Sequence, residues 1–200
     1  MEMRKENNMK KIITKIVSAV LLSVMAVNIA GCDFNSNSMS VDDPITKDIV
    51  NTSSEYVVRG FIESVFCKNR EIFEMCFPEQ FLEISKNAGV DLYDQYSNSV
   101  ELPGEFAGTH YESYVDFTTK TTPEDFEQFR ADIALFHGLE ATDITAVHLI
   151  TIDVYFVIDG ENNYTTITAA AYCHKDKWYM YEISDENTEE VTETSSEQSA

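Results

Sequence analysis

The residue best placed for chemistry is His148, a polar side chain in an otherwise apolar pattern. Even-numbered positions from Ile144 to Ile158 are apolar except His148, which predicts a long strand with His148 on its buried face. If the next strand pairs Ile158 with Asn163, Cys173 lies opposite His148, and a thiol beside an imidazole can become a nucleophile. The alternative is a core histidine hydrogen-bonded to a neighbouring hydroxyl, since the sequence identifies no third group to orient the imidazole.

A second polar and aromatic cluster surrounds Asp116. Apolar and polar residues alternate from Tyr111 to Phe117, which predicts another strand carrying Tyr111, Tyr114 and Asp116. If the sheet encloses a cavity, the tyrosine hydroxyls would orient a small apolar ligand at its mouth. The other interpretation is that the tyrosines are sheet formers at the rim of the core. Asp153 lies on the opposite face of the predicted strand from His148 and is expected to point to solvent.

No metal or dissociable cofactor is expected. The acidic stretches Asp42-Asp43 and Asp159–Asn163 lack the ligand spacing of a calcium loop, so we interpret them as turns. No Cys-x-x-Cys or Cys/His pattern has the spacing of zinc ligands. Cys67 and Cys76 could form a disulfide in an oxidising compartment. The alternative is that they and Cys173 are small apolar core residues.

The N-terminal segment ends in Ile29-Ala30-Gly31-Cys32. Basic residues open it, the stretch Ile16–Ala30 is almost entirely apolar, and that core is shorter than the ~20 residues that a spanning helix needs. The ending resembles the lipobox of bacterial lipoproteins. The resemblance implies cleavage before Cys32 and a covalent lipid on its thiol, hence a protein held by acyl chains on the outer side of a membrane. The basic residues are Arg4, Lys5, Lys10, Lys11 and Lys15.

The charge of the chain limits its partners. The net charge is −21, and the N-terminal leader holds several of the 14 basic residues, so the rest is more acidic still. Such a charge argues against nucleic acid as a partner, because phosphates require basic patches. It also argues against direct adsorption to anionic lipid. The expected partners are the membrane, through the lipid on Cys32, and an envelope protein, a peptide or a small ligand.

Periodicity predicts helices before and between strands. Apolar residues at three- and four-residue steps predict a helix from Ile45 to about Cys67, and Pro78 and Gly89 bracket a further helix, with a short helical turn between them. Thr122 and Gly138 have the residue types of the N-cap and C-terminal stop of another helix. The last third predicts three antiparallel strands, residues 144–158, 163–174 and 178–183, covered by helices on the apolar face.

This order of elements resembles the cone-shaped α+β fold of nuclear-transport-factor-2-like proteins, with a cystatin-like fold as the close alternative. The resemblance covers residues 45–183 and rests on the helix from Ile45, the Pro78 and Thr122 helices and the strands that end at Trp178. That family includes isomerases and dehydratases with Asp, His and Tyr in the cone, and also modules that catalyse no reaction. No catalytic motif of the family can be transferred to this sequence.

The sequence therefore predicts a signal peptide (1–31), a flexible tether (32–44), an α+β domain (45–183) and a disordered acidic tail (184–200). The first functional hypothesis is a lipid-anchored, non-catalytic binding module of the cell envelope. The second is a small cone-fold enzyme that uses His148 or Asp116 for acid–base chemistry, with Cys173 as a further candidate.

Overall fold

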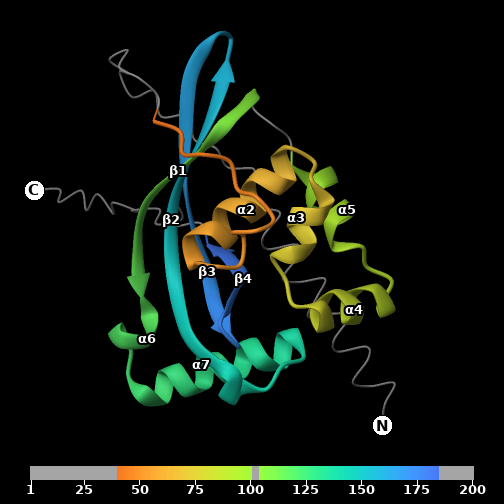
Figure 1. The fold of residues 1–200 in the computed structure, drawn as a ribbon, viewed down its shortest axis with the longest axis vertical. Helices are drawn as coiled ribbons and strands as arrows, with labels where there is room; N and C mark the ends of the chain where they lie inside the picture. Colours follow the sequence, from red (N-terminus) through yellow and green to blue (C-terminus); the bar gives the residue numbers. More distant parts are fainter. Residues whose placement is uncertain (1–39, 101–103, 185–200) are drawn as a thin grey trace, which may run out of the picture.

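The computed structural model of the protein describes residues 40–100 and 104–184. Within these ranges helices come first, a strand and two helices follow, and three long strands end the domain (Figure 1). The elements are α2 (Ser54–Phe66), α3 (Arg70–Met75), α4 (Glu79–Asn87), α5 (Leu92–Ser99), β1 (Glu105–Asp116), α6 (Phe117–Lys120), α7 (Pro123–His137), a 3-10 turn (Ala141–Asp143), β2 (Ile144–Ile158), β3 (Glu161–His174) and β4 (Lys177–Ser184).

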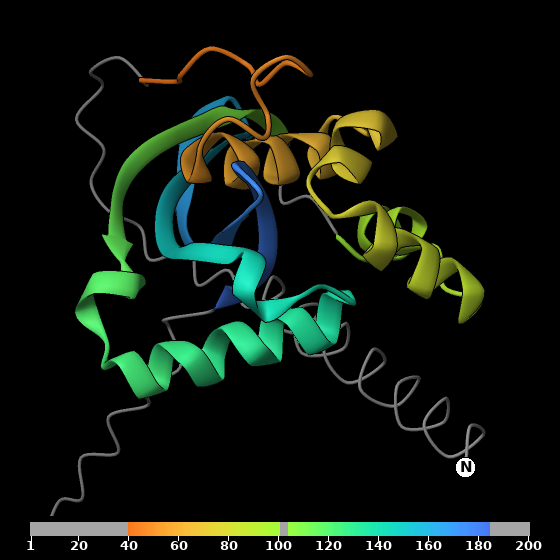
Figure 2. The same ribbon diagram turned by 60° about the horizontal axis from the view of Figure 1, so that its bottom comes forward.

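The four strands form one open antiparallel sheet in the order β1-β2-β3-β4. This arrangement confirms the predicted α+β class. Short turns join β2 to β3 and β3 to β4, as expected for antiparallel neighbours, whereas α6 and α7 lie between β1 and β2. Figure 2 shows that β1 and β2 curve strongly along their length. Register shifts in β1, between Phe106 and Gly108 and between Tyr111 and Ser113, mark bulges, which bend a strand.

Helices cover both faces of the curved sheet. The even-numbered residues of β2 from Ile150 to Phe156 belong to the larger core, in which α2 packs on the sheet and α3, α4 and α5 add their own apolar side chains. On the other face, α7 covers Val147 and Tyr172 in a smaller core (Figure 2). The prediction placed cover on one apolar face only. The second covered face arises because α7 crosses back beneath the sheet after β1.

The first helix of the described chain begins later than its apolar spacing predicted. Residues 47–53 form a turn and a bend, and α2 starts at Ser54, with the hydroxyl of Ser53 accepting a hydrogen bond from the Tyr56 N–H. The predicted start at Ile45 is therefore wrong, because the Ser53 side chain supplies the N-cap hydrogen bond at which the helix begins. Ile45 and Val50 are buried all the same, Ile45 just before the turn and Val50 within it.

The hairpin between β2 and β3 corrects the predicted register. Asp159 and Gly160 alone form the turn, with φ angles of 54° and 84°, and Ile158 pairs with Glu161 instead of Asn163. Asp-Gly suits a two-residue turn whose central residues both have positive φ. His148 consequently pairs with Ala171, and Cys173 pairs with Ala146. The predicted pairing of His148 with Cys173 is wrong by two residues.

Most of the predictions for the two ends of the chain fall on residues outside the described ranges. The signal peptide, the lipidation site Cys32, residues 32–39 of the tether and residues 185–200 of the acidic tail lie outside the described residues. Residues 40–44 of the predicted tether are described, and here the Asp42 N–H donates to the Thr109 carbonyl of β1. No helix within the described ranges combines the length and apolar character needed to cross a bilayer.

Candidate functional site

His148 lies at the centre of a polar cluster drawn from three elements. Its Nδ1 is 2.8 Å from the Oγ of Ser54, the first residue of α2. Its Nε2 is 3.9 Å from Oδ1 of Asp116, the residue opposite it at the end of β1. Asp116 Oδ1 is buried and accepts no hydrogen bond from any described residue. A hydroxyl, an imidazole and a carboxylate therefore follow one another in space, as the groups that activate a nucleophile must.

Two aromatic rings form the walls of this cluster. The Tyr114 ring lies 4.8 Å from the imidazole of His148, centroid to centroid, and the Trp178 ring lies 4.4 Å from it. Tyr114 is 54% exposed, whereas Ser54 is buried. The cluster thus reaches from an exposed ring on β1 to the buried start of α2.

The environment of His148 favours its neutral form. Burial lowers the pKa of the imidazole, and the nearby charge of Asp116 raises it by less, so the pKa lies below the usual value. Burial also raises the pKa of Asp116, but hydrogen bonds from Thr119 and Thr118 and the charge of His148 outweigh this effect and lower it. Near neutral pH the site therefore holds an uncharged imidazole between a hydroxyl and an ionised carboxylate, the protonation state that a general base requires.

The segment before α2 is fixed to the edge strand β4. The Trp178 N–H donates to the Asn51 carbonyl, and the Asn51 side-chain amide donates to the carbonyls of Trp178 and Met75 at 2.8 Å each. These bonds satisfy outward-facing backbone groups of an edge strand that would otherwise be open. They also hold the N-terminus of α2 over the end of the sheet that carries His148.

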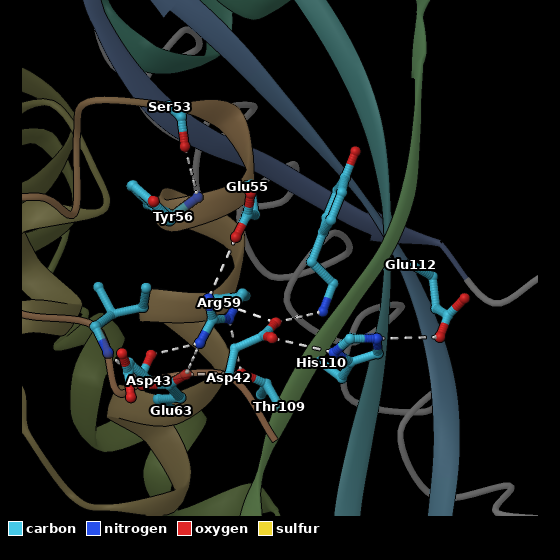
Figure 3. A network of polar contacts seen from close by, with 12 residues as sticks. Asp42, Asp43, Ser53, Glu55, Tyr56, Arg59, Glu63, Thr109, His110 and Glu112 are labelled. Carbon is cyan, nitrogen blue, oxygen red and sulfur yellow. Dashed lines mark hydrogen bonds and ion pairs between the residues drawn. The ribbon is translucent and has the colours of Figure 1, made fainter. Parts of the chain in front are cut away.

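A buried arginine fixes the rest of α2 against β1 (Figure 3). Arg59 is 3% exposed. Its Nε donates to Thr109 Oγ1 of β1 at 3.0 Å, and its Nη2 donates to the Asp43 carbonyl at 2.6 Å. Its guanidinium also pairs with three carboxylates, so the buried charge is compensated. Because Ser54 belongs to α2 and Asp116 to β1, this network helps to set the distance between them. The three carboxylates are those of Asp42, Glu55 and Glu63.

Cys173 and Tyr111 were also predicted for the site. Among the interactions of the described residues, none joins either of them to His148. Cys173 is on the same face of the sheet as His148 but one step along β3, a diagonal of about 7–8 Å between such positions. Tyr111 packs at the edge of the larger core, and its N–H donates to Asp42 Oδ2 at 2.8 Å. This packing agrees with the interpretation of Tyr111 as part of the core rim, and a role of Tyr111 in ligand binding stays a prediction.

The structure bears on two further interpretations of the sequence. Cys67 and Cys76 are free thiols, so the disulfide that their spacing left open is not formed. Cys76 is buried, as expected of an apolar core residue, and its thiol donates to the Ile72 carbonyl, whereas Cys67 is exposed. Asp153 was expected to face solvent but is buried and accepts a hydrogen bond from Thr166 Oγ1 at 2.6 Å. Its strand is central in the sheet, so a neighbouring threonine on β3 replaces water as its partner.

A separate groove lies among α3, α4 and α5, on the helical layer. Its volume is 470 Å³, within the range of about 300–1,000 Å³ that is usual for ligand sites. Apolar and aromatic side chains form its floor, and charged side chains form its rim. The floor consists of Phe73, Leu82, Val90, Leu92 and Tyr93, and the rim of Arg70, Glu74, Glu79, Glu83, Lys86 and Asp91.

The charged side chains at the rim of this groove include more acids than bases. Arg70 already pairs with Asp91 at 2.8 Å and with Glu74 at 3.6 Å, and its guanidinium lies 4.6 Å from the centre of the Tyr93 ring. Its positive charge is thereby largely neutralised. Glu79 and Glu83 outnumber the remaining base, Lys86, so a cationic group is the charge that the rim would attract.

Sequence reasoning missed Ser54 and Trp178 as neighbours of His148. Ser54 stands 94 positions away from His148, in a Ser-Ser pair that indicates only a helix start. Trp178 packs at the edge of the larger core as well as on His148, and its place at the start of a predicted strand indicated neither contact. The interpretation of His148 as a histidine bonded to a neighbouring hydroxyl agrees with the Ser54 contact.

The described residues contain no group of three or more His, Cys, Asp or Glu side chains arranged to hold a metal ion. Comparison of the chain with protein-family models, with curated proteins and with solved structures finds no match. The function of the protein therefore has to be argued from its own side chains.

Proposed function

We propose that the protein is a lipid-anchored extracytoplasmic protein that binds a small or peptide ligand in the groove among α3, α4 and α5. The observation that carries the binding role is the groove itself: an apolar floor of ligand-sized volume inside an acidic rim. The ligand that complements it joins an aliphatic or aromatic group to a cation, as a peptide with a Leu-Lys pair does.

The anchoring role is supported by the leader and by Cys32. A basic start, a short apolar core and Ala-Gly-Cys in succession are the features on which lipid attachment depends. Lipid anchoring explains how a strongly acidic domain stays at a membrane whose surface repels it, because each buried methylene contributes ~0.8 kcal/mol.

We also propose that the fold is a cone of the nuclear-transport-factor-2-like or cystatin-like type. Its support is the arrangement of α2 against all four strands of a sheet whose long strands curve around it (Figures 1 and 2). The resemblance to these folds in the order of helices and strands, noted from the sequence, adds to this support.

The binding role can be tested by NMR titration of the full chain in detergent micelles with acetyl-Leu-Lys-amide. We expect shifts concentrated at groove residues such as Gly89 and Val90, and weaker binding at higher salt, because the rim attracts the lysine. Glu83→Gln should weaken binding about two- to fivefold, the range for a partly exposed ion pair.

Two controls make this titration decisive. Acetyl-Leu-Glu-amide has the same apolar side chain with the opposite charge and should bind more weakly. Glu124→Gln, in the first turn of α7, removes one carboxylate away from the groove and should leave the titration unchanged. Equal binding of the two peptides, or shifts spread away from α3, α4 and α5, would contradict the proposed ligand site.

A further inference from the structure

We propose that Ser54 is a nucleophile for acyl transfer, with His148 as its general base and Asp116 as a positioning residue, and that the substrates are carboxylic esters. This activity goes beyond the binding role and uses a different part of the domain. The juxtaposition that carries it is the 2.8 Å contact of Ser54 Oγ with His148 Nδ1, together with Asp116 Oδ1 on the opposite side of the imidazole.

The two nitrogens of His148 face different partners. Nδ1 lies toward the serine hydroxyl, so in its neutral form it can accept the hydroxyl proton while Nε2 keeps its own proton. Nε2–H then points toward Asp116, whose buried Oδ1 accepts no other hydrogen bond within the described chain. At 3.9 Å the carboxylate stabilises the imidazolium by its charge, and a short movement would complete a hydrogen bond.

The position of Ser54 in α2 supplies the remaining requirement, a site for negative charge. Ser54 is the first residue of a 13-residue helix. The first N–H groups of a helix have no acceptor within it, and the helix dipole favours an anion there. The Ser53 hydroxyl caps the Tyr56 N–H, and the N–H groups of Ser54 and Glu55 remain to stabilise the oxyanion of a tetrahedral intermediate.

The reaction balances without any cofactor. Ser54 Oγ attacks the ester carbonyl carbon as its proton passes to His148 Nδ1. The tetrahedral intermediate collapses, the carbon–oxygen bond to the alcohol breaks, and the leaving alkoxide takes the proton from Nδ1. Water then attacks the acyl-serine, gives its proton to Nδ1, and the bond to Ser54 breaks. Ser54 regains that proton, and the net change is ester plus water to acid plus alcohol.

The walls of the site indicate the preferred substrate. Tyr114, on the exposed side, and Trp178, on the inner side, both contact the imidazole. Flat aromatic walls suit planar or short acyl and aryl groups. Ser54 itself is buried, so small aryl esters should react better than esters with long acyl chains.

The test is labelling of the full chain in detergent with a fluorophosphonate probe, combined with hydrolysis of p-nitrophenyl acetate. The expected result is a single adduct that peptide mass spectrometry locates on Ser54. Ser54→Ala should abolish labelling, and His148→Gln should slow it at least about a hundredfold, the scale of general base catalysis. Thr52→Ala removes a hydroxyl two positions away, which donates to the Ile49 carbonyl, and should label as the wild type does.

Asp116→Asn tests the positioning role through the pH profile. The groups that face His148 are Ser54 from α2, Tyr114 and Asp116 from β1, and Trp178 from β4. Because the charge of Asp116 raises the pKa of His148, its removal should move the acidic limb of the labelling rate to lower pH and also slow labelling. An effect of Asp116 on packing alone would leave the position of that limb unchanged.

The location of the adduct in the wild-type chain decides the proposal even if a variant fails to fold. Labelling at Ser54 that depends on His148 supports it. No adduct on Ser54 at any pH between 6 and 9, or an adduct formed equally by the His148→Gln protein, would overturn it.

Discussion

Ser54 and His148 are joined by a hydrogen bond of 2.8 Å between the start of a helix and the first part of a strand, 94 residues apart in the chain. The contact links α2 to β2 at the place where Asp116 ends β1 and Trp178 follows the first residue of β4. The same geometry fixes the packing of α2 and supplies a polarised hydroxyl.

The contact should appear as a coupling between the two side chains. In a double-mutant cycle with Ser54→Ala and His148→Asn, we expect a coupling energy of about 0.5–1.5 kcal/mol, the net contribution of one hydrogen bond. Urea unfolding of the four proteins measures it. The cycle of Ser54→Ala with His110→Asn, in the middle of β1 and bonded to Asp42, should give additive effects. Additivity in the first cycle as well would argue against the contact.

Arg59 should be among the most sensitive positions for stability. Arg59→Met removes the guanidinium that pairs with Asp42, Glu55 and Glu63 and leaves these carboxylates facing one another. The expected loss is about 3–5 kcal/mol in the free energy of unfolding, typical of breaking a buried ion pair by removing one partner. Thermal and urea unfolding both report it.

The matched control for Arg59 is Lys47→Met. Lys47 pairs with Glu71 at the surface, with about half of its side chain exposed, and exposed pairs contribute ~0–1 kcal/mol. Equal losses for the two variants would mean that the Arg59 network contributes no more than a surface pair.

His137 should make the domain sensitive to acid. Its imidazole is fully buried against Phe81 and Tyr172, and burial lowers its pKa from 6.5 to about 3. The unfolded chain therefore binds a proton near pH 6.5 that the folded chain binds only near pH 3. The contribution of His137 to the free energy of unfolding is fully present above pH 6.5. It falls by about 1.4 kcal/mol for each pH unit below that value.

The contribution of His137 can be isolated by measuring how the free energy of unfolding changes with pH between 6.5 and 4.5. His137→Gln should flatten this slope, even though it destabilises the domain. Phe136→Leu, which reduces packing in the same turn and keeps the histidine, should leave the slope unchanged. A slope in His137→Gln as steep as in the wild type would show that other groups cause the acid sensitivity.

Gly160 should be required for the β2–β3 register. Its φ of 84° is costly for any residue with a Cβ, although no atom lies within 4 Å of the place where that Cβ would stand. Gly160→Ala should therefore cost about 1–2 kcal/mol from backbone strain alone. Asp159→Asn keeps a residue type that tolerates positive φ and should be nearly neutral. Thermal unfolding separates the two, and a neutral Gly160→Ala would argue against the two-residue turn.

Local signals in the sequence predicted most of the fold. The Thr122 cap, the Gly138 stop and the period-two pattern from Ile144 to Ile158 all correspond to observed elements. Each of these features depends on neighbours within a few residues. The start of α2 was missed because apolar residues from Ile45 onward mimic helical spacing, while the capping role of Ser53 carries a weaker signal.

The candidate site was only partly predictable for the same reason. His148, Asp116 and Tyr114 lie on strands whose alternation is visible in the sequence, and the structure brings them together. Ser54 joins them only because the segment at Asn51 bonds to β4 and Arg59 bonds to β1. Pairings across 94 and 127 residues leave no periodic pattern, and a two-residue error in one turn displaced Cys173 from its predicted partner.

The claim on which the proposed function most depends is that this domain is held at a membrane by lipid on Cys32. Intact mass spectrometry of the chain recovered from membranes of a lipoprotein-processing bacterium tests it directly. The account predicts a polypeptide that begins at Cys32 and carries a diacylglyceryl group on the sulfur, with Cys32→Ser abolishing that species. A chain that keeps residues 1–31, or one that begins at Cys32 with an unmodified thiol, would contradict it.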